Sequence, residues 1–122
     1  PSEHLDIKYH HRRFSSRLDD FMRLSHAIIA TPGGIGTNLE LFFAWQLLQL
    51  GHMTERPIIL LGESFWRGLL DWMQQQQIGQ GLVSPGDMRW VHVVNTPEEA
   101  MPLILAEYQK FVDRLKAKGG SE

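Results

Sequence analysis

Residues 26–40 read His-Ala-Ile-Ile-Ala-Thr-Pro-Gly-Gly-Ile-Gly-Thr-Asn-Leu-Glu and divide into three parts. An apolar run, Ala27–Ala30, has the length of a buried strand. A glycine-rich turn, Pro32–Gly36, follows and leaves room for positive φ. Thr37 then opens a long apolar helix. Together they predict an anion site, because the first amides of a helix have no partner within it and its dipole attracts negative charge.

Two common phosphate loops do not fit this turn. A Walker loop needs a lysine after its last glycine, and none follows Gly36. The dinucleotide fingerprint G-x-G-x-x-G needs a glycine where Leu39 stands. The turn therefore favours a phosphate or a mononucleotide. A purely structural interpretation stands beside it, because Thr37 and Glu40 also have the spacing of a capping box, in which each side chain satisfies an amide of the helix end.

The same residues carry a family resemblance. Pro32-Gly33-Gly34-Ile35-Gly36-Thr37-x-x-Glu40 resembles the PGGxGTxxE motif of the LOG family, which are nucleoside 5′-monophosphate phosphoribohydrolases often labelled lysine decarboxylases. The family also carries an arginine fifteen residues before the motif proline, and Arg17 holds that position here. The usual wording around it, Met-His-Glu-Arg-Lys, is replaced by Ser15-Ser16-Arg17-Leu18, and Arg12 is the alternative if the alignment contains a gap.

The resemblance implies a Rossmann-like α/β fold, hydrolysis of the N-glycosidic bond of a nucleoside 5′-monophosphate, and dimers. Four amides are expected to hold the phosphate, those of Gly33, Gly34, Gly36 and Thr37, with help from the Thr37 hydroxyl. Glu40 would engage the ribose hydroxyls or the attacking water, and Arg17 would bind phosphate or orient Glu40. No metal or organic cofactor is expected, and no lysine is placed for a pyridoxal phosphate Schiff base. The alternative is a non-catalytic protein of the same superfamily that binds a nucleotide or a phosphate-bearing cofactor.

Length and composition set wider limits. The 122 residues have room for a single domain, 1–122. The net charge of −2 gives no case for a nucleic-acid partner. Cysteine is absent, which excludes thiol chemistry and fits a reducing cytoplasm. No apolar run approaches the ~18 residues of a membrane span, so we expect a cytoplasmic protein without a membrane partner.

The chain begins at Pro1 rather than at an initiator methionine. The resemblance extends over essentially all of it, but only over the C-terminal half to two-thirds of a family member. We therefore expect the N-terminal strands and helices of the family to be missing from this sequence.

Hydrophobic periodicity predicts a regular alternation of strands and helices. The expected strands are 3–9, 27–30, 57–61 and 90–94, and the expected helices are 11–25, 37–50, 65–77 with Ser64 as N-cap, and 96–118. The order β-α-β-α-β-α-β-α predicts a parallel sheet with right-handed crossovers, covered by helices on both faces. Sites in such sheets lie beyond the carboxyl ends of the strands, where the Pro32–Thr37 turn stands.

Three further expectations concern other parts of the chain. Residues 37–50 are apolar almost all round, which predicts burial on all sides and hence a second subunit packed against this helix. His92 alternates with valines, which favours a core histidine over a catalyst. His10 and His11 are adjacent and so share neither a strand face nor a helix face, which argues against a metal site built from both.

Overall fold

A computed structural model describes residues 21–120 of the chain. The fold is α/β, as predicted. Its strands are β1 (Phe21–Arg23), β2 (Ile28–Ala30), β3 (Ile58–Leu61) and β4 (Val91–Val94). Its α-helices are α2 (Ile35–Gln49), α3 (Glu63–Trp72) and α4 (Pro97–Gly120), with a π-helical segment at Met73–Ile78 and a 3-10 turn at Pro85–Met88. The strands predicted at 27–30, 57–61 and 90–94 are confirmed to within one residue.

The four strands form one open sheet in the order β1-β2-β3-β4. β2, β3 and β4 are parallel, with Ile28 opposite Ile58 and Ile58 opposite Val91. β1 runs antiparallel to β2 and places Phe21 opposite Ala30. The parallel prediction therefore holds for β2, β3 and β4, and β1 is an antiparallel addition at one edge.

The prediction of a helix over residues 11–25 was wrong for its last part, since Phe21–Arg23 is a strand. A tight turn over Ser25 and His26 joins β1 to β2, and the Leu24 amide donates to the Ala27 carbonyl at 2.8 Å. So short an apolar segment fits both the helical and the strand periodicity, and its pairing with β2 favours the strand. The rest of that helix, 11–20, and the strand predicted at 3–9 lie outside the described residues.

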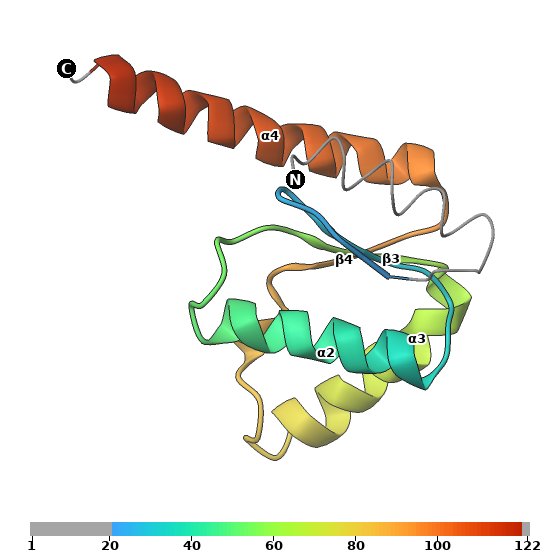
Figure 1. Ribbon diagram of the computed structural model, residues 1–122. Coiled ribbons are helices and arrows are strands. Elements are labelled where there is room, and N and C mark those ends of the chain that lie inside the picture. The colour runs from blue at the N-terminus through green and yellow to red at the C-terminus, as the bar shows by residue number, and fades with distance from the viewer. Residues whose placement is uncertain (1–20, 121–122) are drawn as a thin grey trace.

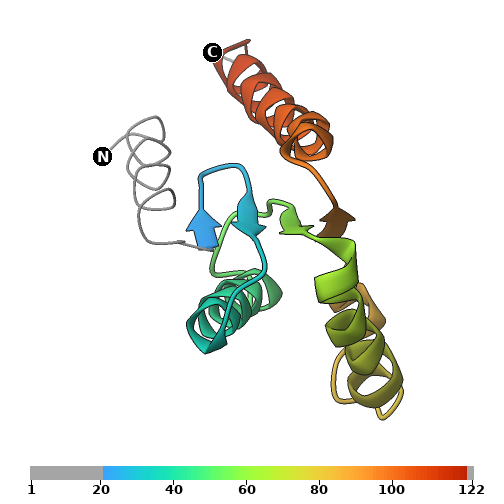
Figure 2. The ribbon, with the colours of Figure 1, turned by 90° about the vertical axis from the view of Figure 1, so that its right-hand side faces the viewer.

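Helices cover both faces of the sheet (Figure 1). α2 and α3 lie against one face and α4 lies against the other, as the turned view of Figure 2 also shows. Alternate residues of a strand point to opposite faces, so each strand feeds two cores. One core joins the sheet to α2 and α3 through Ile28, Ala30, Ile58, Leu60, Leu41 and Trp66, and the other joins it to α4 through Ile29, Ile59 and Ala100.

Two helix starts test the capping predictions. α3 begins at Glu63 after Gly62, so the prediction that Ser64 caps it was wrong. α4 begins after Thr96, whose hydroxyl accepts from the Glu99 amide at 3.2 Å, while the Glu99 carboxylate accepts from the Thr96 amide at 3.2 Å. This reciprocal pair is a capping box, as predicted for this end.

α2 buries only one of its two apolar faces. The buried face holds Leu41, Ala44, Trp45 and Leu48, which pack on the sheet. On the other side, Ile35, Leu39 and Phe43 are 88%, 69% and 57% exposed. The described residues therefore supply no cover for this second face. None of the helices in the same part of the chain combines the length and the apolar character that crossing a bilayer requires.

Candidate functional site

Three loops meet at the edge where β2, β3 and β4 have their carboxyl ends. Gly62, after β3, has a φ of 102° and donates its amide to the Val94 carbonyl at 2.7 Å. Asn95, after β4, accepts the Glu63 amide on its side-chain oxygen at 2.9 Å. Pro32, after β2, lies so close to Gly62 that a Cβ there would come within 3.3 Å of its ring. These contacts lock the loop after β2 to its neighbours.

Neither Gly62 nor Asn95 was among the site residues predicted from the sequence. Gly62 follows a buried strand and could have been suspected, because a glycine at that place often marks a close approach between backbones. Asn95 has no local signal, since its partner Glu63 is 32 residues away.

The first turn of α2 stands at this edge. The helix begins at Ile35 with Gly34 as N-cap, and no side chain among the described residues caps that end. Thr37 is therefore the third helical residue and is buried, while Glu40 is exposed. The capping-box interpretation of Thr37 and Glu40 is wrong, because it requires Thr37 as the N-cap and the observed N-cap, Gly34, lies three residues earlier.

Three backbone amides in this turn precede the helical ladder. The Asn38 amide is the first to reach a carbonyl of the turn, that of Gly34, at 3.1 Å. The amides before it belong to Ile35, Gly36 and Thr37, and the described residues offer them no acceptor in a backbone bond. Gly36 and Thr37 were predicted phosphate ligands. Ile35 was not, because the sequence motif places an arbitrary residue there.

The glycines of the turn are not required by the backbone. Gly34 has a φ of −105° and Gly36 is helical, so the expected positive φ is absent from both. A Cβ added to either would meet no atom within 4 Å. Neither local strain nor packing within the described residues therefore explains glycine at these two positions, and both leave open space beside the helix end.

Glu40 lines a cavity of about 430 Å³ between α2 and β1. The described residues that line it are Phe21, Arg23, Leu39, Glu40, Phe43 and Ala44. Glu40 is the one carboxylate among them and Arg23, on β1, is the one cation. The glycines of the turn are not part of this described lining. Sequence reasoning did not select Arg23, because the helix predicted over 11–25 gave it no place beside Glu40.

Of the three groups expected at the site, the structure describes the glycine-rich turn and Glu40 but not Arg17. The turn and Glu40 belong to the same helix, with Glu40 about 6 Å along its axis from Gly36. Arg17 and its alternative, Arg12, lie outside the described residues, as do His10 and His11. No three His, Cys, Asp or Glu side chains come together within residues 21–120 in a way that could hold a metal ion.

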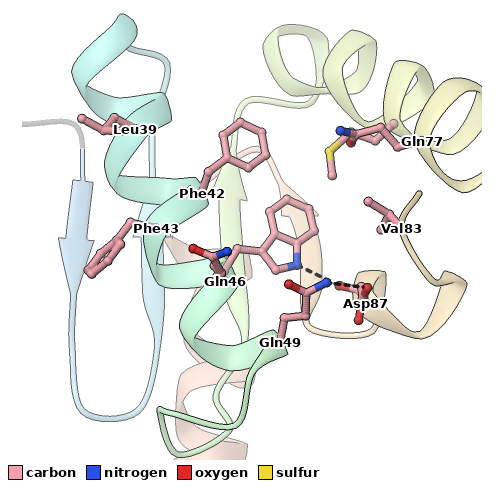
Figure 3. Close-up of a pocket in the computed structure, with 10 residues that line it drawn as sticks. Leu39, Phe42, Phe43, Gln46, Gln49, Gln77, Val83 and Asp87 are labelled. Carbon is pink, nitrogen blue, oxygen red and sulfur yellow. Dashed lines mark hydrogen bonds between the residues drawn. The ribbon is translucent and has the colours of Figure 1, made fainter.

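A further hollow of about 380 Å³ lies on the other side of α2, between that helix and residues 73–88. Figure 3 shows Phe42 and Gln46 on α2, with Gln77 and Val83 across from them. Its one carboxylate, Asp87, already accepts from Gln49 at 2.9 Å and from the Ser84 amide at 3.1 Å. The described lining of this hollow is mainly apolar and holds no carboxylate that is free of hydrogen bonds.

Comparison with known proteins places the chain in a family. A sequence model of the family described as "Possible lysine decarboxylase" matches residues 1–115. The chain belongs to this family. It is the LOG family that the motif in residues 32–40 indicated.

One curated relative comes from rice, Oryza sativa subsp. japonica, and is named "Probable cytokinin riboside 5′-monophosphate phosphoribohydrolase LOGL3". It is 34% identical over 102 residues, which are 81% of this chain and 46% of the relative. The chain therefore spans about half the length of this LOG relative.

Proposed function

We propose that this LOG protein hydrolyses the N-glycosidic bond of a nucleoside 5′-monophosphate and releases the free base and ribose 5-phosphate. The observation that carries the proposal is the first turn of α2, whose amides precede the helical ladder and receive no side-chain cap from residues 21–120. Membership of the LOG family and a relative named as a riboside 5′-monophosphate phosphoribohydrolase support the same reaction.

The phosphate would bind at the turn. The amides of Ile35, Gly36 and Thr37, which have no backbone acceptor among the described residues, would bind it together with those of Gly33 and Gly34. The helix dipole adds positive potential at the same place. The open space beside Gly34 and Gly36 lets a phosphoryl group approach the backbone closely. The Thr37 hydroxyl is proposed as a further donor. Binding energy at this remote group would hold the sugar in position for the reaction at C1′.

Glu40 would act on the sugar. Water adds its oxygen to C1′ as the bond from C1′ to the base nitrogen breaks, and one proton ends on the base. The transition state carries positive charge on the sugar, which a carboxylate beside it stabilises. Glu40 would also hold the ribose hydroxyls or the water, and Arg17 would bind phosphate or orient Glu40. Glu40 is the one carboxylate in the described lining of its cavity, so the proposal uses one carboxylate at the sugar.

Release of free base from AMP and GMP tests this assignment. Glu40 is exposed, so Glu40→Gln should leave the melting temperature unchanged. Base release should fall by about 100-fold or more, because the charge that favours the cationic sugar is lost. Asp71→Asn makes the same exchange at an exposed position of α3 and should leave activity at the wild-type level.

Arg17→Ala should also lower base release. Full activity in both Glu40→Gln and Arg17→Ala would remove the proposed roles. Binding of AMP to the wild-type protein without any base release would instead select the non-catalytic alternative, a protein that binds a nucleotide or a phosphate-bearing cofactor.

We also propose that a second copy of the chain covers the exposed apolar face of α2. Ile35, Leu39 and Phe43 follow one another at four-residue steps, so they form one stripe along the helix. Burying a side chain of this size stabilises an interface by about 1.5–3 kcal/mol. A two-fold pairing places the same stripe on both sides, and these three residues carry no charge that would oppose it.

Light scattering tests the dimer. The wild-type protein should have the mass of two chains, and Leu39→Glu should lower it to one, because the glutamate would be buried without a partner. Leu115→Glu, on α4 at a position of 54% exposure, is the matched control and should stay dimeric. A single-chain mass for the wild-type protein at tens of micromolar would contradict the proposal.

A further inference from the structure

Another cavity lies at the amino ends of β3 and β4, whereas the turn that opens α2 lies at the carboxyl ends of the parallel strands. Its volume is about 550 Å³. It is bounded by residues 54–57, which lead into β3, by residues 89–92 at the start of β4, and by α4. α4 covers the face of the sheet opposite α2 (Figure 2). A ligand here would therefore be separate from the proposed nucleotide site.

Positive charge gathers in this cavity. Among the described residues, four cations line it, Arg56, Arg89, Lys110 and Arg114, against the two carboxylates of Glu55 and Glu107. The chain as a whole carries a net charge of −2, so this excess is local. The cations outnumber the carboxylates by two, and a net positive lining raises the local concentration of anions.

Two of the cations are held in place by backbone carbonyls. Arg56 donates from Nη1 to the Leu24 carbonyl at 2.6 Å and from Nε to the Thr54 carbonyl at 2.9 Å. Arg89 donates from Nη1 to the Gly86 carbonyl at 2.7 Å. These carbonyl bonds fix the orientation of both guanidinium groups at the wall of the cavity.

Arg89 has two further contacts that fix its plane. Its guanidinium carbon lies 3.9 Å from the ring centroid of Trp90, a cation–π contact. Its Nη2 lies 3.3 Å from Glu55 in an exposed ion pair, which is weak and can yield to a more highly charged partner. Trp90 also lines the cavity, and the described residues supply no acceptor for its buried indole N–H.

α4 supplies the other two cations. Lys110 and Arg114 are four residues apart and so share one side of the helix. Lys110 pairs with Glu107 at the long distance of 3.8 Å. The Arg114 side chain forms no hydrogen bond or ion pair with another residue in the range 21–120. The cavity therefore has cations both on α4 and on the segments that precede β3 and β4.

We propose that this cavity binds a small molecule that carries two or more phosphate groups. Its volume is within the range of about 300–1,000 Å³ that small-molecule sites occupy. Four cations within one cavity suit a ligand whose negative charges lie close together, as they do in a diphosphate or triphosphate. Guanidinium groups also match phosphate oxygens in geometry. His92 on β4 also lines the cavity. It is half-buried, so it is not the fully buried core histidine that the sequence predicted.

Calorimetry with inorganic triphosphate tests the site. Arg114→Glu should weaken binding by about tenfold or more, because it replaces an attraction by a repulsion inside the cavity. Lys116→Glu makes the same charge change on the same helix at an exposed position outside the cavity, and should weaken binding by less than about threefold. Thermal unfolding of both variants checks that they remain folded.

Two more measurements separate this site from the proposed nucleotide loop and from other anions. Gly36→Asp places a carboxylate beside the amides of α2 and should leave triphosphate affinity unchanged. Citrate should bind more weakly than triphosphate. The proposal is overturned if triphosphate does not bind, if Gly36→Asp abolishes its binding, if the two α4 variants weaken it equally, or if citrate binds as tightly.

Discussion

Two glycines at the carboxyl edge of the sheet serve different purposes. Gly62 has positive φ and lies against Pro32, so a side chain there would be strained in both respects. Gly36 is helical and faces open space. The structure therefore explains Gly62 by the fold itself, whereas nothing in the fold of the described residues requires glycine at position 36, where we propose that the phosphate binds.

Substitution of Gly36 by alanine separates stability from binding. Alanine favours the helix, so Gly36→Ala should raise the free energy of unfolding by up to about 1 kcal/mol. Its Cβ tilts toward the helix N-terminus, where the phosphate is proposed to bind, so the affinity for AMP should fall by about tenfold. Chemical denaturation and calorimetry measure the two effects.

Gly68→Ala is the matched control for this prediction. Gly68 lies inside α3, and a Cβ there would also meet nothing within 4 Å. This variant should gain similar stability and bind AMP like the wild-type protein. AMP affinity unchanged in Gly36→Ala would show that the open space at the turn has no role in binding.

At the scale of elements, α2 and α4 differ in how their first turns are satisfied. α4 is capped locally, since the Glu99 carboxylate accepts from the Asn95 amide at 2.6 Å as well as from Thr96. α2 receives no side-chain cap from the part of the chain that the structure describes, since its N-cap is Gly34. An anion can take the place of a side-chain cap at such a helix end.

Removal of the α4 cap should cost stability. Glu99→Ala removes the acceptor of two amides and one charge that complements the helix dipole, so the free energy of unfolding should fall by about 1 kcal/mol. Urea denaturation measures the change. Glu98→Ala, in the same turn but in no hydrogen bond among the described residues, should cost less than half as much. Equal losses would mean that the dipole, and not the capping bonds, stabilises this end.

At the scale of the whole molecule, two cores on opposite faces of one sheet hold the loops in place. The larger core joins the sheet to α2 and α3, and Trp66 is its largest fully buried side chain. The Trp66 indole also donates to the Leu61 carbonyl at 3.0 Å. Because the loops start where these strands end, loss of this packing should disturb the site as well as the fold.

Two tryptophans of α3 give a matched test of this core. Trp66→Ala should lower the free energy of unfolding by about 3–5 kcal/mol, since it leaves a large cavity. Trp72→Ala, at a position of 52% exposure, should lower it by less than about 1 kcal/mol. Thermal unfolding with a fixed heat-capacity change measures both. Similar losses in the two variants would contradict the prediction that burial of Trp66 in the core stabilises the fold.

The sequence by itself determined the features that depend on neighbours along the chain. These are the apolar runs of β2, β3 and β4, the capping box of α4, the α/β fold, and the turn between residues 32 and 37 with its family motif. Hydrophobic period and turn chemistry are local properties, so a single sequence displays them.

Only the tertiary structure decided the features that depend on distant partners. Phe21–Arg23 became a strand because β2 offered it a hydrogen-bonding edge. α2 begins at Ile35 in a loop that Pro32 fixes against Gly62, thirty residues away. The basic cavity joins residues near 56, 89 and 114, which no local pattern relates. Such contacts arise when packing brings separate elements together, so the chain's local chemistry does not contain them.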